Sequence, residues 1–439
     1  MAIGIEHDRG AQWLMASDPT LDPDRAKARL DRACLVLSFD GSLAEPWAQA
    51  AALTCVAAGQ RMFRRGVYLA GPIEARGALS QSPAGSFQQQ MGAAGACSGA
   101  APEHAVRLHI GPNPPNGAYA CWTDGWSACA GPGGARLESR LGNEISGALA
   151  ASMAIAALFQ RHVLSDLRAA RRALRLSAWG PDAPAQAALR FLPADLWMLG
   201  LGNLGQANLW ILGLLPYWDT SKVRLLLQDF DTAGLENLDV QVLTEPLWVG
   251  RKKTRSAAAW AEARGFRTVI EERPFSASTR PGREEPRTLI AGVDNLEARR
   301  LATAAGFDLV VDAGLGATAS EAFDLRLHAF PGRRTPEQAW PEAEPATVSP
   351  TLSPAWEKAV ADGRIDRCGA LTIAGKSVGV PCAALAAAAL QIGQTVRAIA
   401  TGRCCDLVDA SLPLANDAAF KVMEAELASR PAFVEASPR

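Results

Sequence analysis

Short apolar runs alternate with helical segments between residues 194 and 330. The runs DLWMLG, VRLLLQDFD, TLIAGVD and LVVDAG are rich in Leu, Val and Ile and end in Gly or Asp, which predicts strands. Further strands are predicted near Thr268 and over 323–330, and helices after Asn203, after Arg251 and over 295–305. Such alternation forms a mostly parallel sheet covered by helices. The second half of the chain is therefore predicted to be a Rossmann-like α/β domain.

The first 180 residues carry a weaker pattern of the same kind. Strands are predicted over 33–38, 66–70, 106–110 and 118–122, and helices over 44–59 and 143–162, with a basic amphipathic helix continuing to residue 174. Residues 71–102 are rich in Gly, Ser, Gln and Ala, which predicts a long loop. The segment WGPDAP over 179–184 is the expected linker. We therefore predict two α/β domains, over 1–180 and 190–439.

Length and composition fit two domains of a soluble protein. The chain has 439 residues, 49% of them hydrophobic, which exceeds what one core usually organises. Its 44 Lys and Arg residues balance 45 Asp and Glu residues, so charge gives no reason to expect nucleic acid or a membrane as partner. The longest apolar run, over 378–393, is shorter than the ~20 residues that span a bilayer, which predicts a buried helix. No secretory signal is visible, so we expect a cytoplasmic protein without a transmembrane span.

The cysteines indicate a reducing environment. There are nine, scattered along the chain and odd in number, which favours free thiols. No CxxC pair occurs, whereas a structural zinc site normally uses two such pairs or Cys and His equivalents. No zinc site is expected.

The sequence GLGNLG over 200–205 follows an apolar strand and opens a helix, which is the context of a phosphate-binding loop. Gly200 permits the tight turn, and Gly202 lets the backbone approach a phosphate. Asn203 begins a helix whose N–H groups attract an anion, and Gly205 allows close packing. The alternative is that these glycines serve packing alone.

Polar residues after the second strand of this domain favour ATP over a nicotinamide cofactor. Asp229 lies where a carboxylate accepts hydrogen bonds from ribose hydroxyls, which both kinds of enzyme share. Asp231, Asn237 and Lys253 follow it, and an enzyme that splits ATP between its α and β phosphates needs such groups around the developing charge. The alternative for Lys253 is an exposed lysine at a helix start.

Asp294 follows the strand TLIAGV, at the edge where parallel sheets bind ligands. Its carboxylate could hold Mg²⁺ against phosphates. The alternative is an N-cap for the helix that begins near Leu296.

Taken together, these motifs resemble the E1-like (ThiF-type) adenylating enzymes, which include bacterial activators of sulfur-carrier proteins and eukaryotic ubiquitin-activating enzymes. The resemblance covers about residues 196–315, through GLGNLG, DFDT followed by NLDVQ, VGRKK, and DN followed by Arg299. It implies MgATP-dependent adenylation of the C-terminal Gly of a ubiquitin-like protein. The ATP and Mg²⁺ residues it implies are Gly200, Gly202, Asn203, Gly205, Asp229, Asp231, Asn237, Lys253 and Asp294.

The second step of such a mechanism is thioester transfer, for which Cys368 is the candidate. It ends the long irregular connection over about 331–367, the expected crossover loop, and the adjacent Arg367 could lower its pKa. The alternative is an ordinary loop cysteine. The missing CxxC pairs favour the ubiquitin-like conjugation branch, so the expected partners are a ubiquitin-like protein and an E2-like protein. Fused two-half activators of this size resemble those of bacterial ubiquitin-like conjugation operons, some of which are linked to antiphage defence.

Family members pair two adenylation folds, so the resemblance predicts that residues 1–180 are an inactive adenylation-like domain. The alternative is an unrelated α/β binding domain. A homodimer of the chain is a second way to pair two adenylation folds. One position departs from the family, since Val240 in NLDVQ stands where an Arg is usual. Arg251, Lys252 or an arginine of the N-terminal half would have to replace that charge. Three other functions stay open: a sulfur-carrier activator, a nicotinamide-dependent oxidoreductase, and a catalytically silent scaffold for a ubiquitin-like protein.

Overall fold

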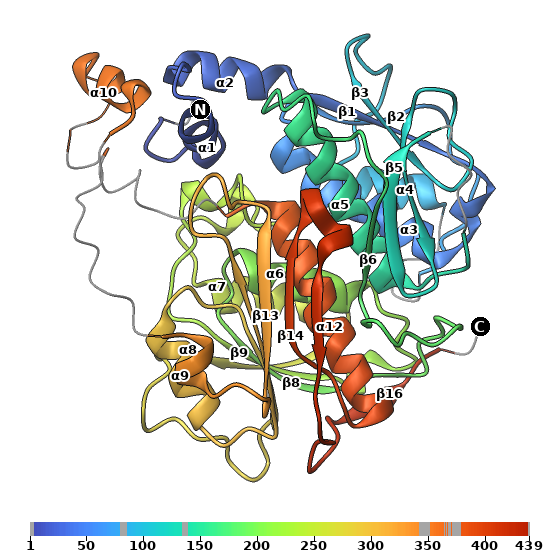
Figure 1. Ribbon diagram of the computed structural model, residues 1–439, viewed down its shortest axis with the longest axis vertical. Coiled ribbons are helices and arrows are strands. Elements are labelled where there is room, and N and C mark those ends of the chain that lie inside the picture. The colour runs from blue at the N-terminus through green and yellow to red at the C-terminus, as the bar shows by residue number, and fades with distance from the viewer. Residues whose placement is uncertain are drawn as a thin grey trace.

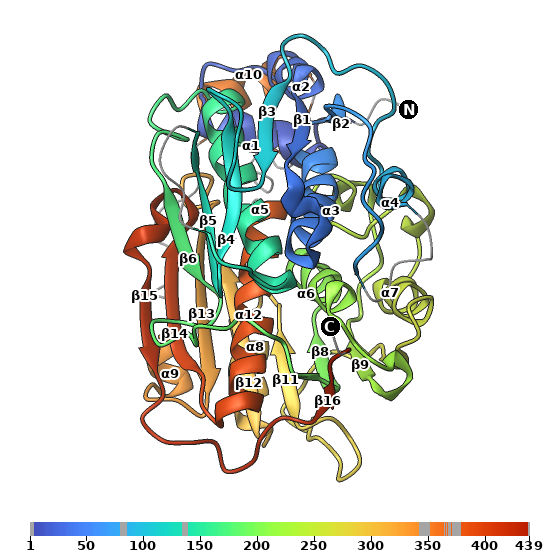
Figure 2. The ribbon, with the colours of Figure 1, turned by 90° about the vertical axis from the view of Figure 1, so that its right-hand side faces the viewer.

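Two sheets whose central strands share one order lie one above the other along the long axis of the molecule (Figures 1 and 2). The computed structural model describes residues 4–79, 86–133, 139–341, 352–363, 365, 367, 370 and 379–437. Cys368 and parts of the expected crossover loop lie outside the described residues.

The N-terminal sheet has the order β2-β1-β3-β4-β5-β6. Its first four strands are parallel and the last two are antiparallel. The strands are β1 (Cys34–Phe39), β2 (Gly66–Leu69), β3 (Val106–Ile110), β4 (Tyr119–Asp124), β5 (Ser127–Pro132) and β6 (Leu174–Ser177). The helices of this half are α1 (Arg9–Ser17), α2 (Pro23–Arg32), α3 (Pro46–Met62), α4 (Phe87–Ala93) and α5 (Glu144–His162).

The C-terminal sheet has the order β10-β9-β8-β11-β12-β13-β14-β15. The strands are β8 (Asp195–Leu199), β9 (Arg224–Gln228), β10 (Arg267–Glu271), β11 (Thr288–Ala291), β12 (Leu309–Leu315), β13 (Asp324–Phe330), β14 (Cys405–Ser411) and β15 (Ala419–Val422). The helices are α6 (Asn203–Leu214), α7 (Lys253–Glu262), α8 (Leu296–Ala304), α9 (Pro336–Ala339), α10 (Pro354–Ala361) and α12 (Pro381–Thr401). A two-stranded sheet joins β7 (Phe191–Pro193) to β16 (Phe433–Glu435). The parallel run from β10 to β12 confirms the predicted α/β class.

The central strands of the two sheets correspond one to one. The order β2-β1-β3-β4-β5-β6 repeats as β9-β8-β11-β12-β13-β14, with the same change from parallel to antiparallel pairing. A long buried helix precedes the last strand of each set, α5 in the first half and α12 in the second. The two halves therefore share one topology.

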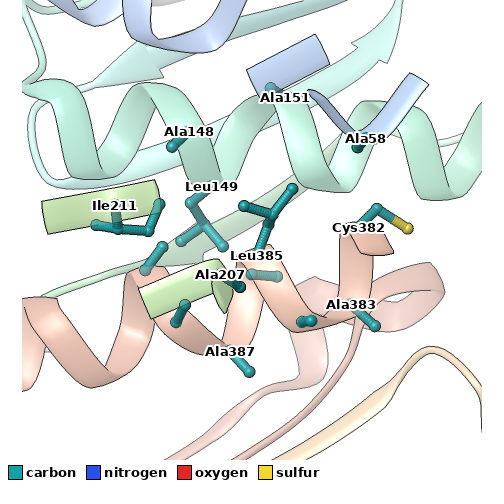
Figure 3. Close-up of a cluster of buried hydrophobic side chains, with 14 of the residues drawn as sticks. Ala58, Ala148, Leu149, Ala151, Ala207, Ile211, Cys382, Ala383, Leu385 and Ala387 are labelled. Carbon is teal, nitrogen blue, oxygen red and sulfur yellow. The ribbon is translucent and has the colours of Figure 1, made fainter. Parts of the chain in front are cut away.

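Alanine-rich helices join the halves through one hydrophobic core. Helix α5 packs against α3 and α12, and α12 packs against α6. Figure 3 shows Leu149 of α5 among side chains of α6 and α12 that include Ala207 and Leu385. Small side chains let helix axes approach closely, and burial of their apolar surface stabilises the contact. By length and composition α12 could cross a membrane, yet its apolar window is entirely buried, which confirms the predicted buried helix.

Three local predictions in the first half were wrong. Helix α4 lies within the expected loop over 71–102, where Ser86 and Gln89 form a capping box. No helix follows α5 to residue 174, because Ser165 and Ala170 take positive φ angles of 61° and 57° that interrupt helical backbone. Strand β5 was missed because its sequence SACAGP lacks the large β-branched residues that mark strands.

Candidate functional site

The glycine-rich loop connects β8 to α6 and takes a shape that requires two of its glycines. Gly200 has φ of +84°, and a Cβ there would lie 2.8 Å from the Cγ1 atom of Val293. A Cβ at Gly205 would lie 1.9 Å from the Gly200 carbonyl oxygen. A Cβ at Gly202 would meet no atom within 4 Å. Packing thus explains Gly200 and Gly205, whereas the open space at Gly202 fits a ligand that approaches the start of α6.

Asp229 holds this loop in place at the end of β9. Its carboxylate accepts hydrogen bonds from the backbone N–H groups of Leu201, at 2.6 Å, and Asp231, at 2.8 Å. The side chain is buried, so these bonds are shielded from water. Asp229 therefore shapes the glycine-rich loop, a role that spacing alone does not show.

Lys253 is the first residue of α7, but it is not the exposed lysine of the alternative hypothesis. It is only 7% exposed, and its Nζ atom lies 2.7 Å from the Asp231 carboxylate. Its backbone N–H donates to the carbonyl of Asp231, which ties the start of α7 to the end of β9. Lys253 is thus linked to the glycine-rich loop through Asp231 and Asp229.

Asn203 carries an unsatisfied side chain at the start of α6. Both polar atoms of its carboxamide are buried and, within the described part of the chain, have no hydrogen-bond partner. Buried polar groups normally have one, so a free carboxamide beside an open loop fits a polar ligand. Gly379 lies close enough that a Cβ there would be 2.9 Å from Asn203 Nδ2, so the chain passes the loop again shortly after Cys368.

Asp294 does not cap the helix that follows it. It is exposed and has no hydrogen-bond or ion-pair partner among the described residues. The cap of α8 is instead Asn295, whose side chain accepts from the N–H groups of Glu297 and Ala298. The N-cap alternative for Asp294 is therefore wrong.

Arg299 fixes the loop that carries Asp294. Its guanidinium donates to the Val293 carbonyl at 2.6 and 2.9 Å and pairs with Asp312 at 3.2 Å. Burial raises the pKa of the Asp312 carboxyl to about 6, although Arg299 acts in the opposite direction. Val293 also touches Gly200, so the Asp294 loop and the glycine-rich loop lie against each other.

Asn237 ends the short helix η3 (Leu235–Asn237), where its side chain accepts the N–H of Gly234 at 3.0 Å. A buried cluster that sequence reasoning missed joins the next residues to α6, since Gln206 Nε2 donates to Gln241 at 2.7 Å and to Thr244 at 2.9 Å. Gln206, the residue after GLGNLG, would have been the signal, because polar side chains inside apolar helices need partners.

Gln391 is a second residue that sequence reasoning missed. From α12 it donates to the carbonyls of Ala291 and Val311, each at 2.8 Å, and accepts from Asn208 of α6. It therefore ties the end of β11, which precedes the Asp294 loop, to the middle of β12. A glutamine in the apolar run of this helix was the available signal.

The described cysteines leave no strong rival for the transfer role predicted for Cys368, which itself lies outside the described residues. Seven of the eight described cysteines are buried and Cys97 is half-buried. Burial raises the pKa of Cys405 to about 11 and that of Cys382 further, which suppresses thiolate formation. Arg367 pairs with Glu357 of α10 at 2.8 Å, so this carboxylate already neutralises part of its charge.

Comparisons with known proteins find relatives for both halves. Family models described as the BilD N-terminal domain and the BilD C-terminal domain match residues 35–178 and 192–402. The bacterial E1-like protein BilD of Collimonas sp. (strain OK412) is 35% identical over 311 residues, which cover 69% of this chain and 67% of that protein.

Solved structures of MccB from E. coli are more distant. The complex with succinimide has a TM-score of 0.34 and 13% identity over 54% of this chain and 66% of that chain. The complex with ATP has a TM-score of 0.33 and 14% identity over 52% and 64%. The present chain thus spans slightly less than two thirds of the MccB chains.

Proposed function

Because the chain belongs to the BilD family of bacterial E1-like proteins, we propose that it uses MgATP to adenylate the C-terminus of a ubiquitin-like protein. One observation carries the proposal: a buried lysine and an unpaired carboxylate, Lys253 and Asp294, lie on the segments that border one open glycine-rich loop. A nicotinamide enzyme needs the loop and Asp229 but has no use for this cation and carboxylate.

The residues present fit ATP and Mg²⁺. The N–H groups at the start of α6 lie beside the open space at Gly202, where phosphates can bind. The buried carboxamide of Asn203, in the same turn, has no hydrogen-bond partner among the described residues. Among the described residues no three His, Cys, Asp or Glu side chains cluster as a metal site, so Asp294 would hold Mg²⁺ together with phosphate oxygens. Bound Mg²⁺ neutralises phosphate charge during phosphoryl transfer.

In this reaction the terminal carboxylate of the ubiquitin-like protein attacks the α-phosphorus of ATP. The bond to the β-phosphate breaks, and pyrophosphate leaves with the electron pair. Lys253 stabilises the negative charge that develops, because it is held beside the loop by Asp231. Asn237 and Asp229 keep their segments in place through bonds to backbone N–H groups.

Arg9 is our candidate for the positive charge that Val240 does not supply. It begins α1 in the N-terminal half and is half-buried, and among the described residues no carboxylate pairs with it. Burial lowers the pKa of Arg9, whereas the charge of Glu236, next to Asn237, raises it. Lys252 is a weaker candidate because its Nζ atom already donates to the Phe230 carbonyl at 2.5 Å.

Residues 1–180 fit an inactive adenylation-like domain. Asp40 follows β1 as Gly200 follows β8, and the two sheets share their strand order. The Asp40 carboxylate accepts the N–H groups of Ser42, at 2.8 Å, and Asn113, at 3.1 Å. Backbone N–H groups at the position that corresponds to the glycine-rich loop thus donate to the Asp40 carboxylate, which leaves them unavailable to a phosphate.

In the second step, the Cys368 thiolate attacks the acyl-adenylate carbonyl, AMP leaves, and the thioester passes to an E2-like protein. A sulfur-carrier activator is the main alternative, and it would end in a persulfide. The adenylation proposal is tested by thermal unfolding with MgATP and with NAD in parallel, since a ligand at ~100 times its Kd adds ~2.7 kcal/mol. Stabilisation by NAD alone would refute it, and pyrophosphate–ATP exchange with the ubiquitin-like protein completes the test.

A further inference from the structure

One arginine of the N-terminal half joins two distant segments beside the candidate site. Arg64, just after α3, donates to Asp8 through Nη1 at 2.9 Å and through Nη2 at 2.5 Å. The same Nη2 atom donates to Asp239 at 3.0 Å. Asp8 caps α1, and Asp239 lies in the turn directly before Val240. A single guanidinium therefore connects α1 to the NLDVQ segment.

This connection is shielded from water. The side chain of Arg64 is 14% exposed, and those of Asp8 and Asp239 are 4% and 17% exposed. Burial raises the pKa of the Asp239 carboxyl, whereas the charge of Arg64 lowers it. Removing one partner from a buried ion pair leaves an uncompensated charge, so such a pair separates only at high cost.

The backbone of α1 is adapted to Arg64. A Cβ at Gly10 would lie 2.7 Å from Arg64 Nη2, so a larger residue would push the guanidinium away from the two carboxylates. Gly10 is in the first turn of α1, where glycine costs helix stability and needs a compensating reason. Space for Arg64 is that reason.

The segments that Arg64 joins carry the residues proposed to act on ATP. Arg9 follows Asp8 directly, and Glu236 and Asn237 precede Asp239 by two or three positions. His7 lies 3.7 Å from Glu236, so the N-terminal arm contacts the η3 turn at a second point. Among the described residues, no hydrogen bond or ion pair joins Arg64 to the glycine-rich loop or to Asp294.

We propose that Arg64 is a positioning residue that clamps α1 to the turn over 235–239 and so brings Arg9 and Asn237 to the same phosphates. The proposal rests on the adenylating function. It explains how this chain works with Val240: the missing charge comes from the other half of the protein, and a buried ion cluster fixes where it lies. A fork-shaped guanidinium suits this task because it bonds two carboxylates at once.

The test compares Arg64→Met with Arg65→Met in the full chain. Arg65 is the exposed neighbour of the same type, and it shows no side-chain hydrogen bond or ion pair among the described residues. Arg64→Met should speed amide hydrogen exchange in both α1 and residues 235–241 and raise the KM for ATP by at least about 10-fold, because small displacements of catalytic groups are costly. Arg65→Met should change neither.

A second variant separates positioning from stability. Asp239→Asn in the Arg64→Met background removes one of the two buried carboxylates that lose their partner, so it should recover part of the melting temperature while the KM for ATP stays raised. Recovery of both together would show that Arg64 only stabilises the fold, and unchanged exchange in α1 would also overturn the proposal. If the wild-type protein uses no ATP, the proposed function fails, and loss of protection in both segments would still support the clamp.

Discussion

The backbone N–H of Leu201 donates to the carboxylate of Asp229 at 2.6 Å, which joins the glycine-rich loop to the end of the neighbouring strand. The other carboxylate oxygen accepts the N–H of Asp231, whose own carboxylate pairs with Lys253. Through Asp229 the loop, the strand end and the buried lysine form one connected unit.

Replacing Asp229 by Ala should therefore harm folding as well as nucleotide binding. Two N–H groups lose their partner, and an unsatisfied buried group costs ~1–3 kcal/mol. We expect urea unfolding to show that the free energy of unfolding falls by about 2–4 kcal/mol for the two bonds. The loss stays in this range because water that enters the site replaces part of the lost hydrogen bonding. Stabilisation by MgATP should disappear. The exposed Asp417→Ala variant is the control, and an Asp229→Ala protein with unchanged stability would contradict the role.

Asp294 and Asn295 are neighbours with separate tasks, which makes them a matched pair for mutation. Asp294→Ala should leave the free energy of unfolding within about 0.5 kcal/mol, because it removes an exposed side chain without partners. Pyrophosphate–ATP exchange should be lost with the Mg²⁺ ligand. Asn295→Ala should show the reverse: a loss of ~1 kcal/mol from the missing helix cap and retained exchange. Full exchange in Asp294→Ala would refute its assignment to Mg²⁺.

Elements with strong local patterns were predictable from the sequence. Asn143 caps α5 where the predicted helix began, and β8, β9, β11 and β12 fall on the predicted apolar runs. Burial of both sheet faces produces continuous runs of large apolar residues, so parallel strands are easy to recognise. β5 could not be recognised because its small side chains are buried without such a run.

The contacts that organise the site depend on tertiary structure and left only weak signals. Arg64 and Asp239 are 175 residues apart, and nothing in the local sequence of either predicts their bond. Asp294 and Asn295 are both suitable cap residues by type, and only the structure shows that Asn295, with extended backbone, caps α8. The glycine-rich loop was predictable because its chemistry is local.

The thioester prediction can be tested although Cys368 lies outside the described residues. Cys368→Ser should retain pyrophosphate–ATP exchange, because adenylation does not use the thiol. A thiol-sensitive adduct with the ubiquitin-like protein, seen on non-reducing gels, should vanish. Cys97→Ser is the control, since Cys97 is the most accessible of the described cysteines. A thiol-sensitive adduct that persists in Cys368→Ser would place the nucleophile elsewhere.

The buried pair Asp312 and His328 should give stability an unusual pH dependence. They lie opposite each other on β12 and β13, and both are almost fully buried. Burial raises the pKa of Asp312 to about 6, so the folded state holds this proton more tightly than the unfolded state, and stability falls as pH rises from about 4 to about 6. Burial lowers the pKa of His328 to about 4, so its contribution rises with pH over about 4 to 6.5.

These two contributions oppose each other over the same pH range, so single substitutions should expose each one. Asp312→Asn removes the contribution that falls as pH rises, so the free energy of unfolding should rise more steeply with pH than in the wild type. His328→Asn removes the contribution that rises with pH, so the free energy of unfolding should rise less steeply with pH than in the wild type, or should fall. Urea unfolding at several pH values between about 4 and 6.5 measures both slopes. If the two variants changed the slope in the same direction, one of the assigned pKa shifts would have the wrong sign.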